Sequence, residues 1–260
     1  MRSRNSAKRG HRLTLRTAQA VWNDHGPNAS TPLEAFYAVK EGLPVIAAAN
    51  WQAASRPNHL TRAQFLEAYP ILEATTPGQN LDRRIPSKTD LVARYELSGS
   101  ERSSSRVTDT SGNGYDAILE NGVLHTPLGS KGPKYTVLIS VSCAQKSGVL
   151  LSGPDTSFGV MPFEGGSTLA FTSSNIVYPL LNHTLDPACR SSDREVILIG
   201  TENRTAAWVD GKHAGDFVIG IDGTTEFQPM AFVAPAQQIH TRKFALWDGV
   251  QEISSISGHR

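Results

Sequence analysis

The stretch Asp109–Leu119 reads D-T-S-G-N-G-Y-D-A-I-L and ends in an apolar run. Gly112 and Gly114 can supply the positive φ angles that a tight loop needs. The side chains of Asp109 and Asn113 can bond the backbone amides of such a loop. The stretch therefore predicts a loop closed by its own polar side chains, with strands on either side.

The chain around this loop is dominated by short strand-like segments. Turn residues such as Asn121-Gly122 and Asp210-Gly211 separate these segments. Many short strands with regular turns and no helical period predict an antiparallel sandwich or jelly roll. The expected strands include residues 91–97, 135–142, 148–151, 168–172, 196–200, 205–209 and 244–248.

Before about residue 85 the apolar residues recur at helical spacing instead. Ser30 or Thr31 is a suitable N-cap, Pro32 fits the first helical position, and Glu34 lies where a capping-box acid would reach back. The G-L-P sequence at 42–44 predicts either two helices or one kinked helix. A further helix is expected to begin after Thr61 as its N-cap and to end near residue 77.

The overall composition excludes several classes of partner. The 260 residues include 25 Lys and Arg against 24 Asp and Glu, and the net charge is near +1. We therefore expect no nucleic acid and no membrane as partner. No apolar run reaches the roughly 18 residues of a membrane span. The basic run Arg2–Arg16 lacks the apolar core of a secretory signal peptide, and residues 1–18 are predicted to be a disordered leader.

Three sequons, at Asn28, Asn182 and Asn203, favour an extracellular or secretory-pathway location, where they would be glycosylated. Cys143 and Cys189 permit one disulfide but do not require it.

Metal binding has little support in the sequence. The histidines at 183, 213 and 240 show no ligand spacing. Asp109, Asn113 and Asp116 are closely spaced oxygen donors that could hold Ca²⁺, or they could form a self-bonded Asx turn, which is the preferred interpretation. We expect no cofactor and no metal.

Trp22 and Asp24 are the candidate ligand-binding residues. They lie two positions apart on a segment expected to be extended, so their side chains would project from the same face. An aromatic ring can stack on the apolar face of a sugar while a carboxylate accepts hydrogen bonds from its hydroxyls. The alternative is a core tryptophan beside a capping aspartate.

A longer stretch carries a family resemblance. Trp22–Trp51, W-N-D-H-G-P-N-A-S-T-P-L-E-A-F-Y-A-V-K-E-G-L-P-V-I-A-A-A-N-W, and the later T-P-G-Q-N-L-D-R of Thr76–Arg83 resemble the end of the catalytic domain in fungal-type β-N-acetylhexosaminidases of glycoside hydrolase family 20. The resemblance implies a (β/α)₈ TIM barrel and a substrate-assisted retaining mechanism. Trp22 would then wall the sugar pocket, and Asp24 would bind the distal hydroxyls.

The Asp-Glu catalytic pair of that family lies on an earlier strand, for which this chain has no room. The nearby Glu34 and Glu41 fall on the predicted helix, where we expect them to face solvent. A second resemblance, over about residues 91–250, is to laminin-G-like, concanavalin-A-like sandwiches. It is carried by the Asp109–Leu119 stretch, by Thr205–Lys212 with its V-D-G turn and by Phe244–Gly249.

The predicted fold class is therefore mixed: a partial TIM-barrel end, with the last strand and its helices, is followed by an all-β jelly-roll sandwich. The expected domains are the leader at 1–18, the barrel remnant at 19–85, a linker at 86–90 and the sandwich at 91–260.

We expect a hexosaminidase-type glycoside hydrolase that acts on N-acetylhexosamine-containing glycans when full-length and is inactive as this chain. The alternatives are a non-catalytic carbohydrate-binding module and a structural β-sandwich that braces the barrel.

Overall fold

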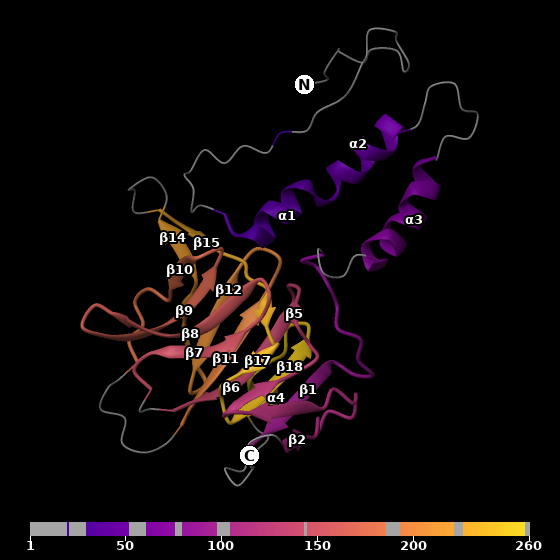
Figure 1. Ribbon diagram of the computed structural model, residues 1–260. Coiled ribbons are helices and arrows are strands. Elements are labelled where there is room, and N and C mark those ends of the chain that lie inside the picture. The colour runs from indigo at the N-terminus through magenta and orange to yellow at the C-terminus, as the bar shows by residue number, and fades with distance from the viewer. Residues whose placement is uncertain are drawn as a thin grey trace.

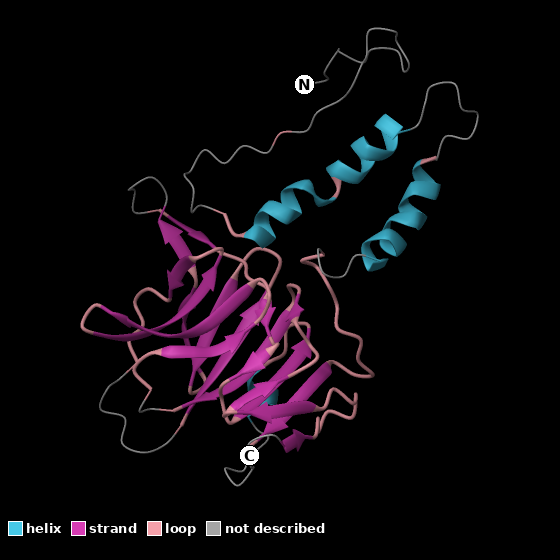
Figure 2. Ribbon diagram, in the orientation of Figure 1, coloured by secondary structure: helices cyan, strands magenta, loops and turns pink. Residues whose placement is uncertain are grey.

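The computed structural model describes residues 20, 30–51, 61–75, 80–97, 105–142, 145–185, 193–220 and 226–257. Two packed antiparallel β-sheets dominate this part of the chain, and a helical arm extends from one end of them (Figures 1 and 2). The helices are α1 (Pro32–Lys40), α2 (Gly42–Trp51), α3 (Arg62–Thr75) and α4 (Ile253–Ser257). None of the described helices is long and apolar enough to span a membrane.

The strands are β1 (Leu91–Glu96), β2 (Ser105–Val107), β3 (Ala117–Glu120), β4 (Val123–His125), β5 (Ser130–Lys131), β6 (Tyr135–Val141), β7 (Gly148–Ser152), β8 (Thr156–Phe163), β9 (Gly166–Ser173), β10 (Ile176–Pro179), β11 (Arg194–Gly200), β12 (Thr205–Val209), β13 (Lys212–Asp216), β14 (Val218–Gly220), β15 (Phe227–Pro229), β16 (Ala234–Pro235), β17 (Gln238–Ile239) and β18 (Lys243–Asp248). One sheet has six strands in the order β1-β18-β6-β11-β12-β13, and the other has eight in the order β10-β9-β8-β7-β17-β4-β3-β2. Two further pairs, β14-β15 and β16-β5, complete the set in the described residues.

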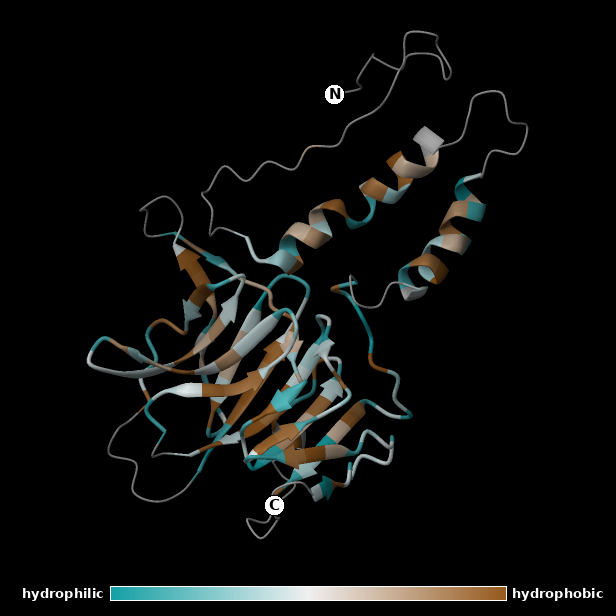
Figure 3. Cartoon of the chain, viewed as in Figure 1, coloured by the Kyte–Doolittle hydropathy of each residue, from teal (hydrophilic) through white to brown (hydrophobic). Residues whose placement is uncertain are grey.

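The core lies between the two large sheets because their strands alternate buried and solvent-facing residues. In β8, Thr156, Phe158 and Val160 are buried, while Ser157 and Gly159 between them are partly exposed. Figure 3 shows hydrophobic residues concentrated along the strands of the sandwich. Aromatic rings fill the centre, where Phe171 stacks on Phe232 and meets Phe158 and Phe217 edge-on or tilted, with ring centroids 4.5–5.0 Å apart.

The loop at 109–116 is built as the sequence predicts. Gly112 and Gly114 both have φ of +84°. The Asp109 carboxylate accepts hydrogen bonds from the backbone amides of Arg94, Ser111 and Tyr115. The side-chain amide of Asn113 donates to the carbonyls of residues 91 and 92, so the loop is tied to the start of β1.

The helical arm begins with the predicted capping box. Thr31 is the N-cap of α1: its hydroxyl accepts from the Glu34 amide, and its own amide donates to Glu34 Oε2 at 2.7 Å. Both side chains also reach the sandwich, since the Thr31 hydroxyl donates to the Ala231 carbonyl at 2.7 Å and Glu34 Oε1 accepts from the Ala231 amide at 3.1 Å. The first turn of α1 therefore lies against the sandwich, and α2 and α3 extend away from it (Figure 1).

The predicted mixed fold class is wrong. The described residues form an antiparallel sandwich with a helical arm and contain no TIM-barrel fragment: every pairing in the two large sheets is antiparallel, whereas a barrel requires parallel strands with a helix after each. A capping box, a proline at the first helical position and an apolar run mark the start of a helix in any fold. These signals correctly place α1 and α3 but say nothing of a barrel. The domain boundary at 86–90 stays a prediction.

Candidate functional site

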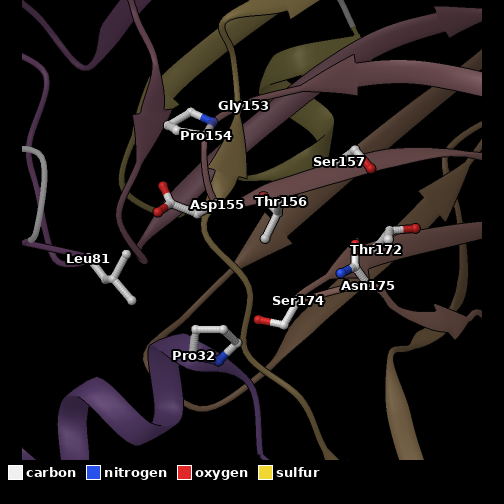
Figure 4. A pocket seen from close by; sticks show the side chains of 10 residues that line it. All are labelled: Pro32, Leu81, Gly153, Pro154, Asp155, Thr156, Ser157, Thr172, Ser174 and Asn175. Atoms are coloured by element: carbon white, nitrogen blue, oxygen red, sulfur yellow. The ribbon is translucent and has the colours of Figure 1, made fainter.

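A pocket of about 470 Å³ lies where the start of α1 meets the outer face of the eight-stranded sheet (Figure 4). It is bounded by the turn between β7 and β8, by the ends of β9 and β10 and by two apolar residues of the N-terminal part. The lining residues are Pro32, Leu81, Gly153, Pro154, Asp155, Thr156, Ser157, Thr172, Ser174 and Asn175. Most of them carry a short polar side chain, so hydrogen-bonding groups dominate this wall.

The floor of the pocket is formed by Ser157 and Thr172. These residues are directly paired across β8 and β9, so their side chains share one face of the sheet. Because their neighbours Phe158 and Phe171 point into the core, Ser157 and Thr172 face outward. The register of one strand pair thus places two hydroxyls side by side on the solvent face.

Ser174 and Asn175 form the rim on the β9–β10 side. Both adopt left-handed backbone conformations, with φ of 51° and 63°. Two successive positive φ angles are the signature of the two-residue hairpin turn, in which asparagine is favoured because it tolerates this conformation. The tight turn places Asn175 in the pocket lining together with Ser157 and Thr172 (Figure 4).

The opposite rim is the turn at 153–156, which Gly153 closes by donating its amide to the Thr156 carbonyl. A Cβ at Gly153 would lie 2.7 Å from Ser130 Oγ, so the turn has no room for a side chain there. Asp155 in this turn forms an ion pair with the Arg83 guanidinium, and both side chains are largely buried. The pair fixes the position of the carboxylate and links residues 80–85 to the sheet.

Pro32 and Leu81 form an apolar wall facing these polar groups. Leu81 packs against the small cluster of Leu33, Ala231 and Val233, which seats α1 on the sandwich. Glu34, two residues after Pro32, is partly buried, and burial raises its pKa against the opposing effect of its hydrogen bonds from Thr31 and Ala231. Pro32 lines the pocket and is the first residue of α1, so the pocket depends on α1 remaining packed against the sandwich.

The chemistry of this pocket suits the binding of a small polar molecule. Among the described residues that line it, Asp155 carries the one carboxylate, and Arg83 neutralises it. Glycoside hydrolysis by two carboxyl groups has no second acid here. Hydroxyl groups, an amide and a paired carboxylate opposite an apolar wall can instead hold a small polar molecule with an apolar edge.

The structure leaves most of the predicted site residues untested. Trp22, Asp24, Asn28, Cys143 and Cys189 lie outside the described residues, so the sugar-contact, glycosylation and disulfide predictions for them stay predictions.

The other two sequons lie in described turns. Asn182 and Asn203 are both exposed, and their glycosylation also stays a prediction.

The preferred Asx-turn interpretation of the 109–116 loop agrees with the structure. Both Asp109 oxygens accept hydrogen bonds from within the protein, and Asp116 accepts from the Asp109 amide and from Arg106. Burial raises the Asp109 pKa, but the bonds from Ser111 and Arg94 outweigh it and hold that pKa below its ordinary value. Within the described ranges, no three His, Cys, Asp or Glu side chains form a metal site.

Comparison with known proteins gives structural likeness and no family. No protein-family model and no curated protein matches the chain. Domain 4 of AbnA, a GH43 extracellular arabinanase from Geobacillus stearothermophilus solved with arabinotriose, is 14% identical; the match covers 66% of this chain and 98% of that one, with a TM-score of 0.40.

A structure of botulinum neurotoxin type C, whose cell entry depends on two ganglioside molecules, is 8% identical over 64% of this chain and 50% of that one, with a TM-score of 0.40. Trypanosoma rangeli sialidase is 14% identical over 75% of this chain and 38% of that one, with a TM-score of 0.35. The chain thus spans half or less of these two proteins. TM-scores below 0.5 assign no function to this chain.

The family prediction is corrected by these results. None of these similar structures is a family 20 β-N-acetylhexosaminidase, no family model matches, and the described fold holds no barrel strand or barrel helix. The stretch that suggested the family contains helix-start and helix-stop signals and an apolar helical run, which are shared by unrelated folds.

The pocket residues were missed at the sequence level. The sequence predicts no more than turns at residues 152–157 (S-G-P-D-T-S) and 173–175 (S-S-N), because Gly, Pro, Ser, Asn and Asp are the ordinary turn residues.

Proposed function

We propose that the chain is a non-catalytic carbohydrate-binding module and that the pocket between α1 and the eight-stranded sheet is its ligand site. The observation that carries the proposal is the two-sided lining. Ser157, Thr172 and Asn175 offer hydroxyl and amide groups on one side, and Pro32 and Leu81 offer apolar surface on the other.

Sugars combine the same two properties. Their hydroxyls donate and accept hydrogen bonds, as the hydroxyls of Ser157 and Thr172 and the amide of Asn175 do. Their C–H faces are apolar and suit contact with Pro32 and Leu81. A volume of about 470 Å³ lies within the range of small-molecule sites, which runs from roughly 300 to 1,000 Å³.

The acetamido sugars are the ligand class we propose first. An N-acetylhexosamine carries an amide that can pair with the side-chain amide of Asn175 and a methyl group that can lie against Leu81. Such ligands occur on cell-surface and extracellular glycans, and we propose that the protein acts there. The exposed sequons at Asn182 and Asn203 support this location.

A glycan array followed by calorimetric titration tests the proposal. The array should carry N-acetylglucosamine-, galactose-, sialic-acid- and arabinose-terminated glycans and be probed with the full chain. Asn175→Gly removes the amide without straining a left-handed position. The loss of one hydrogen bond should weaken binding about tenfold.

Asn121→Gly is the matched control, since Asn121 also has a left-handed backbone, with φ of 51°, but lies in the β3–β4 turn away from the pocket. Its affinity should equal that of the unmodified chain. The proposal is wrong if no glycan binds, or if Asn175→Gly binds as tightly as Asn121→Gly.

A further inference from the structure

A row of polar side chains leaves the pocket and crosses the outer face of the eight-stranded sheet. Direct cross-strand pairing joins Thr172 on β9 to Ser157 on β8, then Ser152 on β7, Gln238 on β17 and His125 on β4. We call these five residues the polar row. Two of them, Thr172 and Ser157, are the floor of the pocket, so row and pocket are continuous.

Alternation along the strands places the whole row on the solvent face. Each member is partly exposed, whereas its strand neighbour is buried in the core. The buried neighbours are Phe171, Phe158, Leu151, Ile239 and Leu124. The side chains of the row therefore stand on one surface, one strand apart.

The row offers groups that donate and groups that accept hydrogen bonds. Three members are hydroxyls, Gln238 has an amide, and His125 has an imidazole. Ser152 Oγ already donates to Gln238 Oε1 at 3.0 Å, which orients the amide so that its NH₂ remains available to a ligand. Beyond the ends of the row, the next paired residues are Val177 and Ile118, both about half exposed, so the polar lining stops there.

The length of the row exceeds what one sugar can contact. From Thr172 to His125 there are four interstrand steps of about 4.8 Å, or roughly 19 Å. A monosaccharide held between Pro32 and Asn175 would contact Ser157 and Thr172 but not Gln238 or His125, which lie two and three strands beyond Ser157.

We propose that the pocket is the terminal subsite of an extended binding track and that the ligand is a linear oligosaccharide lying along the polar row. This inference rests on the proposed carbohydrate-binding function and deepens it. The terminal sugar occupies the pocket, and the following units run across β7 and β17 to β4, where Gln238 and His125 bond their hydroxyls. The site therefore selects unbranched chains of several sugars over single sugars.

Titration of the full chain with a ladder of oligosaccharides tests the track. The probes are chito-oligosaccharides from the monosaccharide to the hexasaccharide, with arabino-oligosaccharides as a second series. Affinity should rise with length until the ligand spans the row and then level off. His125→Ala and Gln238→Ala should each weaken binding of the longest ligand about tenfold and leave binding of the monosaccharide unchanged.

Gln251→Ala is the matched control, because residue 251 bonds Thr136 on β6 of the other sheet. Equal affinity for all lengths, or full-length affinity retained in both row variants, would overturn the track while leaving the pocket and the proposed function standing. Absence of binding in both series and in the glycan array would overturn both proposals. Thermal unfolding of each variant confirms that it is folded, and His125→Ala, at a partly exposed site, is expected to unfold like the unmodified chain.

Discussion

Replacing Asp109 with alanine should strongly destabilise the sandwich. Asp109 is 5% exposed, and its carboxylate accepts from the amides of Arg94, Ser111 and Tyr115 at 2.9–3.1 Å and from the Ser111 hydroxyl at 2.7 Å. These bonds join the start of the sandwich at β1 to the loop before β3. Alanine would leave three backbone donors without their acceptor.

The size of the destabilisation follows from these three backbone donors that would lose their acceptor. An unsatisfied buried donor costs about 1–3 kcal/mol, and water entering the loop would recover part of this. We therefore expect Asp109→Ala to lower the free energy of unfolding by about 3 kcal/mol. Such a loss is a large fraction of the roughly 5–15 kcal/mol that stabilises a typical domain.

Urea unfolding followed by tryptophan fluorescence measures the effect. Asp90→Ala is the control, because Asp90 is exposed just before β1 and should change the free energy of unfolding by less than about 0.5 kcal/mol. If Asp109→Ala were as stable as Asp90→Ala, the idea that the carboxylate holds the loop would be refuted.

Acid titration gives a second readout of the same contact. The hydrogen bonds hold the pKa of Asp109 in the folded protein below its value in the unfolded chain. The ionised carboxylate therefore stabilises the folded protein above about pH 4, and this stabilisation is lost as the pH falls through the folded-state pKa. Asp109→Asn lacks this titration. The stability gap between the unmodified chain and Asp109→Asn should therefore narrow on acidification, and a gap independent of pH would contradict the assignment.

Two further substitutions test the core and the helical arm. Gly200→Ala should destabilise the six-stranded sheet by about 1–3 kcal/mol, because the new Cβ would lie 2.7 Å from Cδ1 of the fully buried Tyr135; an unchanged urea midpoint would show that the ring can move aside. Thr31→Ala removes the N-cap of α1 and the bond to the Ala231 carbonyl. Hydrogen exchange in α1 should therefore accelerate by about tenfold, while β6 and β11 stay protected. Equal protection of α1 in both proteins would mean that the contacts of Thr31 do not hold the helix in place.

Turns and helix starts were predictable where a residue type strongly favours one backbone conformation or one capping role. Asn121-Gly122 and Asp210-Gly211 were expected as tight turns, and all four residues have positive φ. The first helix was expected to have Ser30 or Thr31 as its N-cap and the later one Thr61. Thr31 and Thr61 are the N-caps, and each accepts a hydrogen bond from the amide three residues on. These signals act within a few residues, so neither depends on the rest of the fold.

The context of the helices was not predictable from the same signals. Residues 42–51 form an almost wholly apolar helix, a composition that is usually found in buried helices. In the structure Leu43 and Val45 are more than half exposed on an arm that extends from the sandwich. What a helix packs against is decided by long-range contacts, which the local pattern does not contain.

The candidate site was hidden for a related reason. His125, Ser152, Ser157, Thr172 and Gln238 are spread over more than 110 positions of the sequence, and they meet because four strand pairings share one register. Side chains alternate with a period of two, so slipping β17 by one residue would send Gln238 into the core and bring Ile239 to the surface. The buried isoleucine thus excludes that slip, and the same hydrophobic pattern that stabilises the sheet also keeps the polar row aligned.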